Sequence, residues 1–152
     1  MFKTTSDLIQ HTNSLGLKPI TDISFLPINY EYALSLDEFH FSSHTAELER
    51  QLKLNSINFQ KLDESEDPSF IDNRCDDLIL PTLIHFAHSA ALSIILSVIS
   101  NYLYDKLKRT GIKRNAKMTI INAEGEKVQY LHYEGSVEGL KDIKNWNSSN
   151  DK

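Results

Sequence analysis

At 152 residues, the chain is long enough for one domain with a real hydrophobic core and too short for several domains. Its 40% hydrophobic and 24% charged residues are ordinary values for a globular protein and exclude wholesale disorder. A net charge of −5 at pH 7 argues against a protein that binds nucleic acid through a basic face.

The charge is unevenly distributed along the chain. Residues 1–77 carry 6 Lys and Arg against 14 Asp and Glu, a net of −8, and residues 78–152 carry 10 against 7, a net of +3. Such polarity favours oriented association with a protein partner. A single cysteine, Cys75, forms no disulfide within the chain and suits a reducing compartment. These features predict a cytoplasmic protein with a protein partner.

The first half of the chain predicts a β-α-β arrangement after an N-terminal helix and connector over residues 1–28. A helix starts near Thr5 and stops at Gly16. Alternation over Tyr30–Asp37 predicts a strand, and Leu48 and Leu52 predict a helix over 44–54. Ile57 and Phe59 then indicate a second strand over 56–62. Residues 63–77 read as an acidic linker with a proline break.

The most unusual stretch runs from Leu78 to Tyr104, 27 residues without Asp, Glu, Lys or Arg. It predicts a long helix over 78–109, with the basic residues after it complementing the helix dipole. The uncharged rod would be roughly 40 Å long, as long as the domain is wide, so we expect it to dock against a protein partner, either an effector or a second copy.

Two faces are expected on this helix, an apolar one and one of small polar side chains. Small side chains at intervals of four residues let another backbone approach closely. The residues predicted to make the interaction are Ile84, Ala91, Ile95 and Tyr102 on the first face and Ser89, Ser93, Ser97, Ser100 and Asn101 on the second.

A second interpretation makes residues 78–104 a single membrane span that oligomerises in lipid, which would place the protein in the inner membrane. About 20 apolar residues suffice to cross a bilayer. However, two histidines, an asparagine and a proline dilute the run, and no secretory signal precedes it. We therefore treat the membrane span as the alternative.

The C-terminal part predicts a hairpin and a short helix. Residues 118–121 and 128–133 alternate around a turn at Glu124-Gly125-Glu126, and Ser136 begins a helix that continues to Ile143. The fold class is therefore α+β, with a single domain over residues 29–145 and a polar tail over 146–152.

No motif in the chain names a reaction. His40, His44 and Glu47 have helical spacing that a metal site can use, and His85 and His88 form a similar pair, but buried or solvated histidines are the simpler reading. Neither a nucleophile elbow nor a glycine-rich phosphate loop is present. We expect no catalytic residue, no cofactor and no metal.

The order of parts resembles the effector-associated constant component domains of bacterial conflict systems. The resemblance rests on the β-α-β start, the uncharged helix, Lys106-Leu107-Lys108-Arg109 and the segment Lys117-Met118-Thr119-Ile120-Ile121-Asn122-Ala123-Glu124-Gly125-Glu126-Lys127-Val128-Gln129-Tyr130 before the final helix. It covers about residues 29–145. The resemblance implies an adaptor in antiviral defence, encoded beside an effector, without catalytic residues.

Overall fold

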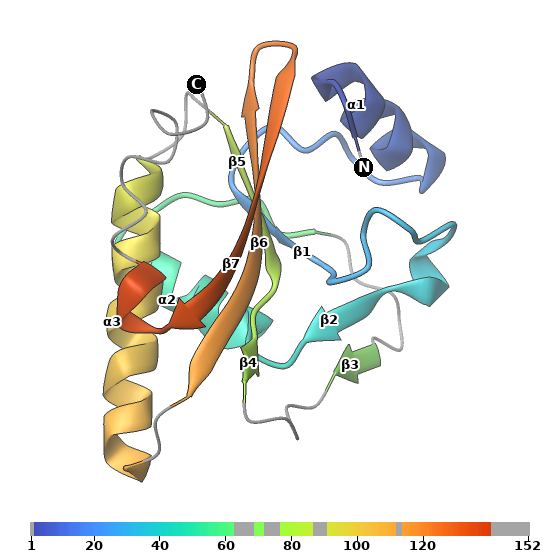
Figure 1. Cartoon of the computed structure of the whole chain (residues 1–152). Helices are drawn as coiled ribbons and strands as arrows, with labels where there is room; N and C mark the ends of the chain where they lie inside the picture. The colour runs from blue at the N-terminus through green and yellow to red at the C-terminus, as the bar shows by residue number, and fades with distance from the viewer. Residues whose placement is uncertain (1, 63–68, 72–76, 87–90, 112–113, 141–152) are drawn as a thin grey trace.

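A computed structural model describes residues 2–62, 69–71, 77–86, 91–111 and 114–140. It confirms the α+β class: a central mixed sheet lies between helices, with a separate two-stranded sheet beside it (Figure 1). The helices are α1 (Thr5–Ser14), α2 (Thr45–Leu54) and α3 (Leu92–Thr110), with a 3-10 turn η1 (Leu36–Glu38). The strands are β1 (Ser24–Leu26), β2 (His40–Ser42), β3 (Ser69–Ile71), β4 (Leu78–Ile79), β5 (Thr82–Phe86), β6 (Asn115–Glu124) and β7 (Lys127–Ser136).

The predicted hairpin is confirmed and supplies two ten-residue strands of the central sheet. β6 and β7 pair antiparallel along their whole length, from Asn115 opposite Ser136 to Glu124 opposite Lys127. Gly125 takes φ 60° in the two-residue turn between them, a conformation that favours glycine. Since β7 fills one edge of β6, the short strands β4 and β5 both pair with the other edge, in parallel.

The predicted helix over residues 78–109 is wrong in its first part. Residues 78–79 and 82–86 are the strands β4 and β5, and the helix begins at Leu92. Strands buried on both faces, as in a parallel arrangement, read as continuous apolar runs that periodicity cannot distinguish from a buried helix. Pro81, which has no amide hydrogen, lies between the two strands, where the pairing is interrupted. The helix of 19 residues is about 28 Å long.

The β-α-β order of the first half is present, but both strands lie elsewhere than predicted. β2 and β3 flank α2 and pair in parallel. The predicted strand at 30–37 is instead a set of turns, in which Tyr32 is 76% and Leu34 83% exposed. Asn29 fixes this loop because its side chain bonds the carbonyl of Glu38 and the amide of His40. Residues 56–62 contain no strand either.

The N-terminal helix packs onto the hairpin. Thr4 is the N-cap of α1 and its hydroxyl accepts a hydrogen bond from the amide of Asp7. The amide of Thr5 donates to the carbonyl of Glu126, and the amide of Phe2 donates to the Tyr130 hydroxyl. These contacts attach α1 to the β6–β7 hairpin, near its turn (Figure 1).

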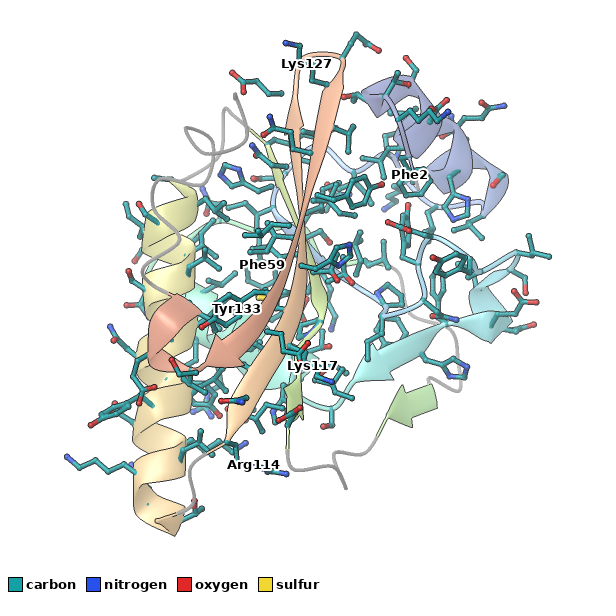
Figure 2. The ribbon with its side chains drawn as sticks, in the orientation of Figure 1. Phe2, Phe59, Arg114, Lys117, Lys127 and Tyr133 are labelled. Atoms are coloured by element: carbon teal, nitrogen blue, oxygen red, sulfur yellow. The ribbon has the colours of Figure 1, made fainter. Side chains whose placement is uncertain are left out.

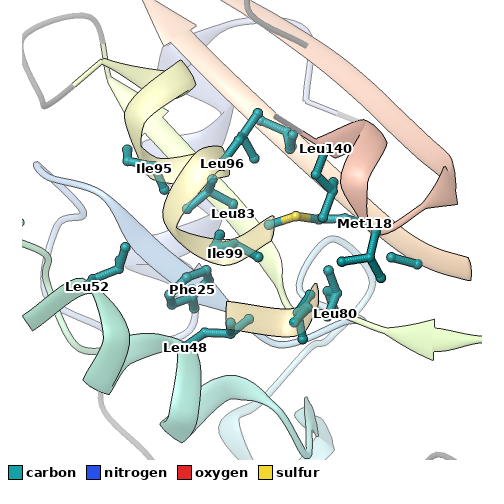
Figure 3. Close-up of a cluster of buried hydrophobic side chains, with 14 of the residues drawn as sticks. Phe25, Leu48, Leu52, Leu80, Leu83, Ile95, Leu96, Ile99, Met118 and Leu140 are labelled. Atoms are coloured by element: carbon teal, nitrogen blue, oxygen red, sulfur yellow. The ribbon is translucent and has the colours of Figure 1, made fainter. Parts of the chain in front are cut away.

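Two hydrophobic clusters lie on opposite faces of the sheet. One holds α2 and α3 against the sheet through side chains such as Leu48, Leu83 and Ile99 (Figure 3). The other packs α1 and the loop around Tyr30 against Ile84 and Ile121. Neighbouring residues of β5 and β6 therefore point into different clusters, as the alternation of a strand requires.

Several predicted segments fall partly outside the described residues. These are most of the acidic linker at 63–77, residues 87–90 of the predicted long helix, residues 141–143 of the final helix and the tail at 146–152. Of the final helix, the described part is a 3-10 turn at residues 138–140, where Leu140 is buried in the first cluster.

Candidate functional site

Helix α3 has one fully buried face and one face open to solvent. Its buried residues are Ile95, Leu96, Ile99, Ser100 and Leu103. Ser100 belongs to this set because its hydroxyl donates to the carbonyl of Val137 at 2.8 Å, beyond the end of β7. The helix ends at Gly111, which takes the left-handed conformation with φ 69°.

The structure divides the nine residues predicted to make the interaction. Ile84, Ile95 and Ser100 are buried in the core of this chain, so they do not face a partner. Ala91 and Asn101 are exposed, and Ser93, Ser97 and Tyr102 are partly exposed. Ser89 lies outside the described residues. The predicted small face is therefore split, since Ser100 points inward while Ser97 and Asn101 remain on the outside.

A stripe of uncharged side chains runs along the open face of α3. It consists of Ile94, Ser97, Asn101 and Tyr104, and we call it the outer stripe. Steps of three, four and three residues place these side chains on one side of a helix. Ile94 is 54% and Tyr104 44% exposed. Exposed helix faces are ordinarily rich in charge, yet residues 92–104 carry none.

One flank of the stripe is closed by contact with α2. The hydroxyl of Tyr102 donates to Glu47 Oε2 at 3.1 Å. Burial and this hydrogen bond to a carboxylate raise the pKa of Tyr102. Tyr102 therefore helps to hold α3 on α2, and the surface open to a partner lies on the other side of α3.

At the C-terminal end of the stripe the surface is hollowed. A cavity of about 480 Å³ lies between the last turns of α3, the start of β6 and the turn after β7. Tyr104 belongs to both the stripe and the cavity wall, and Leu107 and Val137 add further apolar surface. Of the residues that the structure describes, the charged ones at the cavity are Lys108, Arg114 and Glu138. Arg114 lies at the same end of the molecule as the last turn of α3 (Figure 2).

Sequence reasoning missed this cavity. The basic residues that follow the apolar run were the signal for it in the sequence. These residues already have an explanation, since they complement the helix dipole. Lys108 and Arg109 do lie in the last turn of α3. What the sequence does not reveal is that the start of β6 and the end of β7 fold back beside that turn.

The positive charges at this end of α3 affect the pKa of a buried histidine. His44, at the N-terminus of α2, is 8% exposed. Burial, and then the positive charges of Lys106 and Arg114, lower the pKa of His44 from 6.5 to about 4. The folded chain therefore keeps His44 neutral at neutral pH.

We expect His44 to make the protein less stable in acid. Between pH 6.5 and about 4 the unfolded chain binds a proton at His44 that the folded chain does not. The free energy of unfolding therefore falls as the pH drops through this window and is unaffected by His44 above it. Urea unfolding from pH 7 to pH 4 checks this: the variant His44→Gln should lose less stability than the native chain. Equal losses would contradict it.

A second buried polar group joins two strands on the face covered by α3. His85 Nδ1 donates to Asn122 Oδ1 at 2.8 Å, and these two residues are direct neighbours in the β5–β6 pairing. Both side chains are buried. The sequence pairs His85 with His88 on a helix instead, and His88 lies outside the described residues. The strand assignment replaces that interpretation.

The structure also does not bring His40, His44 and Glu47 together as metal ligands. His40 is on β2 and exposed, His44 is buried, and Glu47 is bonded to Tyr102. Within the described ranges, no three His, Cys, Asp or Glu side chains gather as metal ligands do. Among the helices of those ranges, none combines the length and apolar character that crossing a bilayer requires.

The chain matched no family model, no curated protein and no solved structure.

Proposed function

We propose that the protein is a non-catalytic interaction module that binds another protein through the outer face of α3. The observation that carries this proposal is the outer stripe, in which Ile94 and Tyr104 are exposed on a helix whose residues 92–104 have no charge. Two exposed apolar side chains joined by uncharged polar ones form a surface that a partner can cover without burying a charge.

The middle of the outer stripe has side chains that let a protein partner approach α3 closely. Ser97 and Asn101 lie between the two large apolar side chains, and the hydroxyl of Ser97 is already bonded to the carbonyl of Ser93 at 2.8 Å. A serine bonded to its own helix needs no further hydrogen-bond partner when it is covered. A partner can therefore cover this part of the stripe without leaving the hydroxyl unpaired.

The cellular setting follows from the sequence and is part of the same proposal. The single cysteine suits the cytoplasm. From the family resemblance in the order of elements, we propose that the protein is an adaptor of a bacterial defence system and is paired with an effector. An interaction role of this kind needs no catalytic residue.

Two measurements together test the interaction. A photo-crosslinking amino acid is placed at Asn101 on the stripe or, as a control, at Asn13, an exposed asparagine of α1. Light scattering gives the mass of the purified chain. A dimer, or a monomer that crosslinks to another protein in cells from position 101 and not from 13, supports the proposal. A monomer without a crosslink specific to position 101 overturns it.

A charge placed in the stripe should abolish the association. Ser97→Arg introduces a cation into an uncharged contact, where an unpaired charge costs several kcal/mol. Ser14→Arg is the matched control, because Ser14 is an exposed helical serine whose hydroxyl also bonds a backbone carbonyl, that of His11. We expect Ser97→Arg to reduce the crosslink from position 101 at least tenfold, and Ser14→Arg to leave it unchanged. Equal crosslinking in both variants would contradict this prediction.

A further inference from the structure

The cavity at the end of α3 continues the outer stripe. Tyr104 lies in both, so a chain that follows the stripe toward the C-terminus of α3 reaches the cavity directly. Its volume of about 480 Å³ is within the range of pockets that enclose a small ligand or a large side chain with its neighbours.

The walls of the cavity combine apolar surface with a positive rim. Leu107, Val137 and the ring of Tyr104 supply the apolar part, and among the described lining residues the charged ones are Lys108, Arg114 and Glu138. Lys108 makes no salt bridge with any residue in the described part of the chain. Arg114 is also close enough to His44 that, after burial, its positive charge and that of Lys106 lower the pKa of that residue.

We propose that this cavity receives an acidic segment of the protein partner, with a bulky apolar side chain seated against Leu107 and Val137 and a carboxylate beside Lys108 and Arg114. The inference rests on the proposed function and adds the chemistry of the partner to it. Apolar anchors in well-packed pockets carry most of the binding energy of an interface, and complementary charge at the rim selects the partner.

Peptide selection on the full chain tests the chemistry. Random twelve-residue peptides displayed on phage are selected for binding, and the enriched sequences are synthesised with a fluorescent label for titration. We expect enrichment of peptides that carry Leu, Phe or Trp next to Asp and Glu. Their affinity should fall severalfold between about 50 and 300 mM salt, since exposed charge pairs are screened.

Three variants locate the binding. Lys108→Glu reverses the rim charge, and Asn115→Trp fills the cavity from the exposed start of β6. Lys53→Glu is the matched control, because Lys53 lies in the last turn of α2 as Lys108 lies in the last turn of α3. We expect the dissociation constant to rise at least tenfold for the two cavity variants and less than twofold for the control.

The outcomes separate this inference from the proposed function. Selection of neutral or basic peptides, no selection, or equal binding by Lys108→Glu and Lys53→Glu overturns the acidic-segment proposal. If the crosslink from position 101 persists in that case, the interaction through the stripe stands without the cavity. If that crosslink is also absent, both proposals fail.

Discussion

The variant Ile99→Ala is expected to lose about 2–5 kcal/mol of unfolding free energy, the range for truncating a buried isoleucine or leucine to alanine. Ile99 is fully buried between α3 and the sheet, beside Leu83 and Met118 in the same cluster (Figure 3). The loss includes the transfer energy of the deleted carbon atoms and the cavity left behind. For a domain of this size the melting temperature should fall by about 5–15 °C. Denaturant unfolding and calorimetry measure both quantities.

Ile94→Ala is the matched control on the same helix. Ile94 is 54% exposed, so its truncation should change the free energy of unfolding by less than about 0.5 kcal/mol in the monomeric chain. The same variant removes an apolar group from the outer stripe and should weaken association. Equal destabilisation by the two substitutions would contradict the orientation of α3, and with it the surface on which the proposed function depends.

Asn122→Leu is expected to cost about 1–3 kcal/mol, because it removes the acceptor of the buried hydrogen bond from His85. The side chains are similar in size, so the loss reflects hydrogen bonding more than volume. Asn115→Leu, on the same strand but exposed, should change the stability by less than about 0.5 kcal/mol. Urea unfolding of the two variants measures the difference.

A double-mutant cycle isolates the contribution of the pair. In His85→Leu with Asn122→Leu, both partners of this hydrogen bond are replaced, so its loss is counted once and not twice. The double variant should therefore be less destabilised than the sum of the single variants, with a coupling energy of about 0.5–3 kcal/mol. Additive single effects would show that the 2.8 Å contact contributes nothing specific to the fold.

The inward face of α3 packs against other elements of the chain, so only its outward face is open to a partner. Leu96 and Ile99 pack in the cluster on the sheet. Ser100 donates a hydrogen bond to the turn after β7, and Tyr102 donates one to α2. The apolar run that first suggested docking is thus largely consumed by the chain's own core. Fewer residues remain for a partner than the sequence suggests, and they are confined to the stripe.

Local signals in the sequence were enough for three elements. α2 was predicted from Leu48 and Leu52 four residues apart, which are both fully buried in the structure. The hairpin was predicted from two alternating segments around a glycine turn, a pattern that closes within a few residues. α1 was predicted from the capping residues Thr5-Ser6-Asp7 and from Gly16, which takes φ 75° after the helix, although the N-cap in the structure is Thr4. Each of these signals acts between residues that are close along the chain.

The misassigned stretch at residues 30–37 shows why alternation alone does not define a strand. Tyr30, Tyr32 and Leu34 alternate like a strand, but Asn29 bonds across the loop to residues 38 and 40 and closes it into turns. Only Tyr30 of these three is then buried. An alternating pattern indicates a strand only where another strand is present to pair with it.

By itself, then, the sequence determined the α+β class, the α2 helix, the β6–β7 hairpin and the absence of charge from residues 78–104. Only the tertiary structure decided that this uncharged run divides into β4, β5 and α3. The physical reason is that residues 78–86 gain backbone hydrogen bonds from β6, whose paired residues lie 37 or 38 positions further along the chain. The same folding turned Ile95 and Ser100 inward and left Ile94 and Tyr104 at the surface.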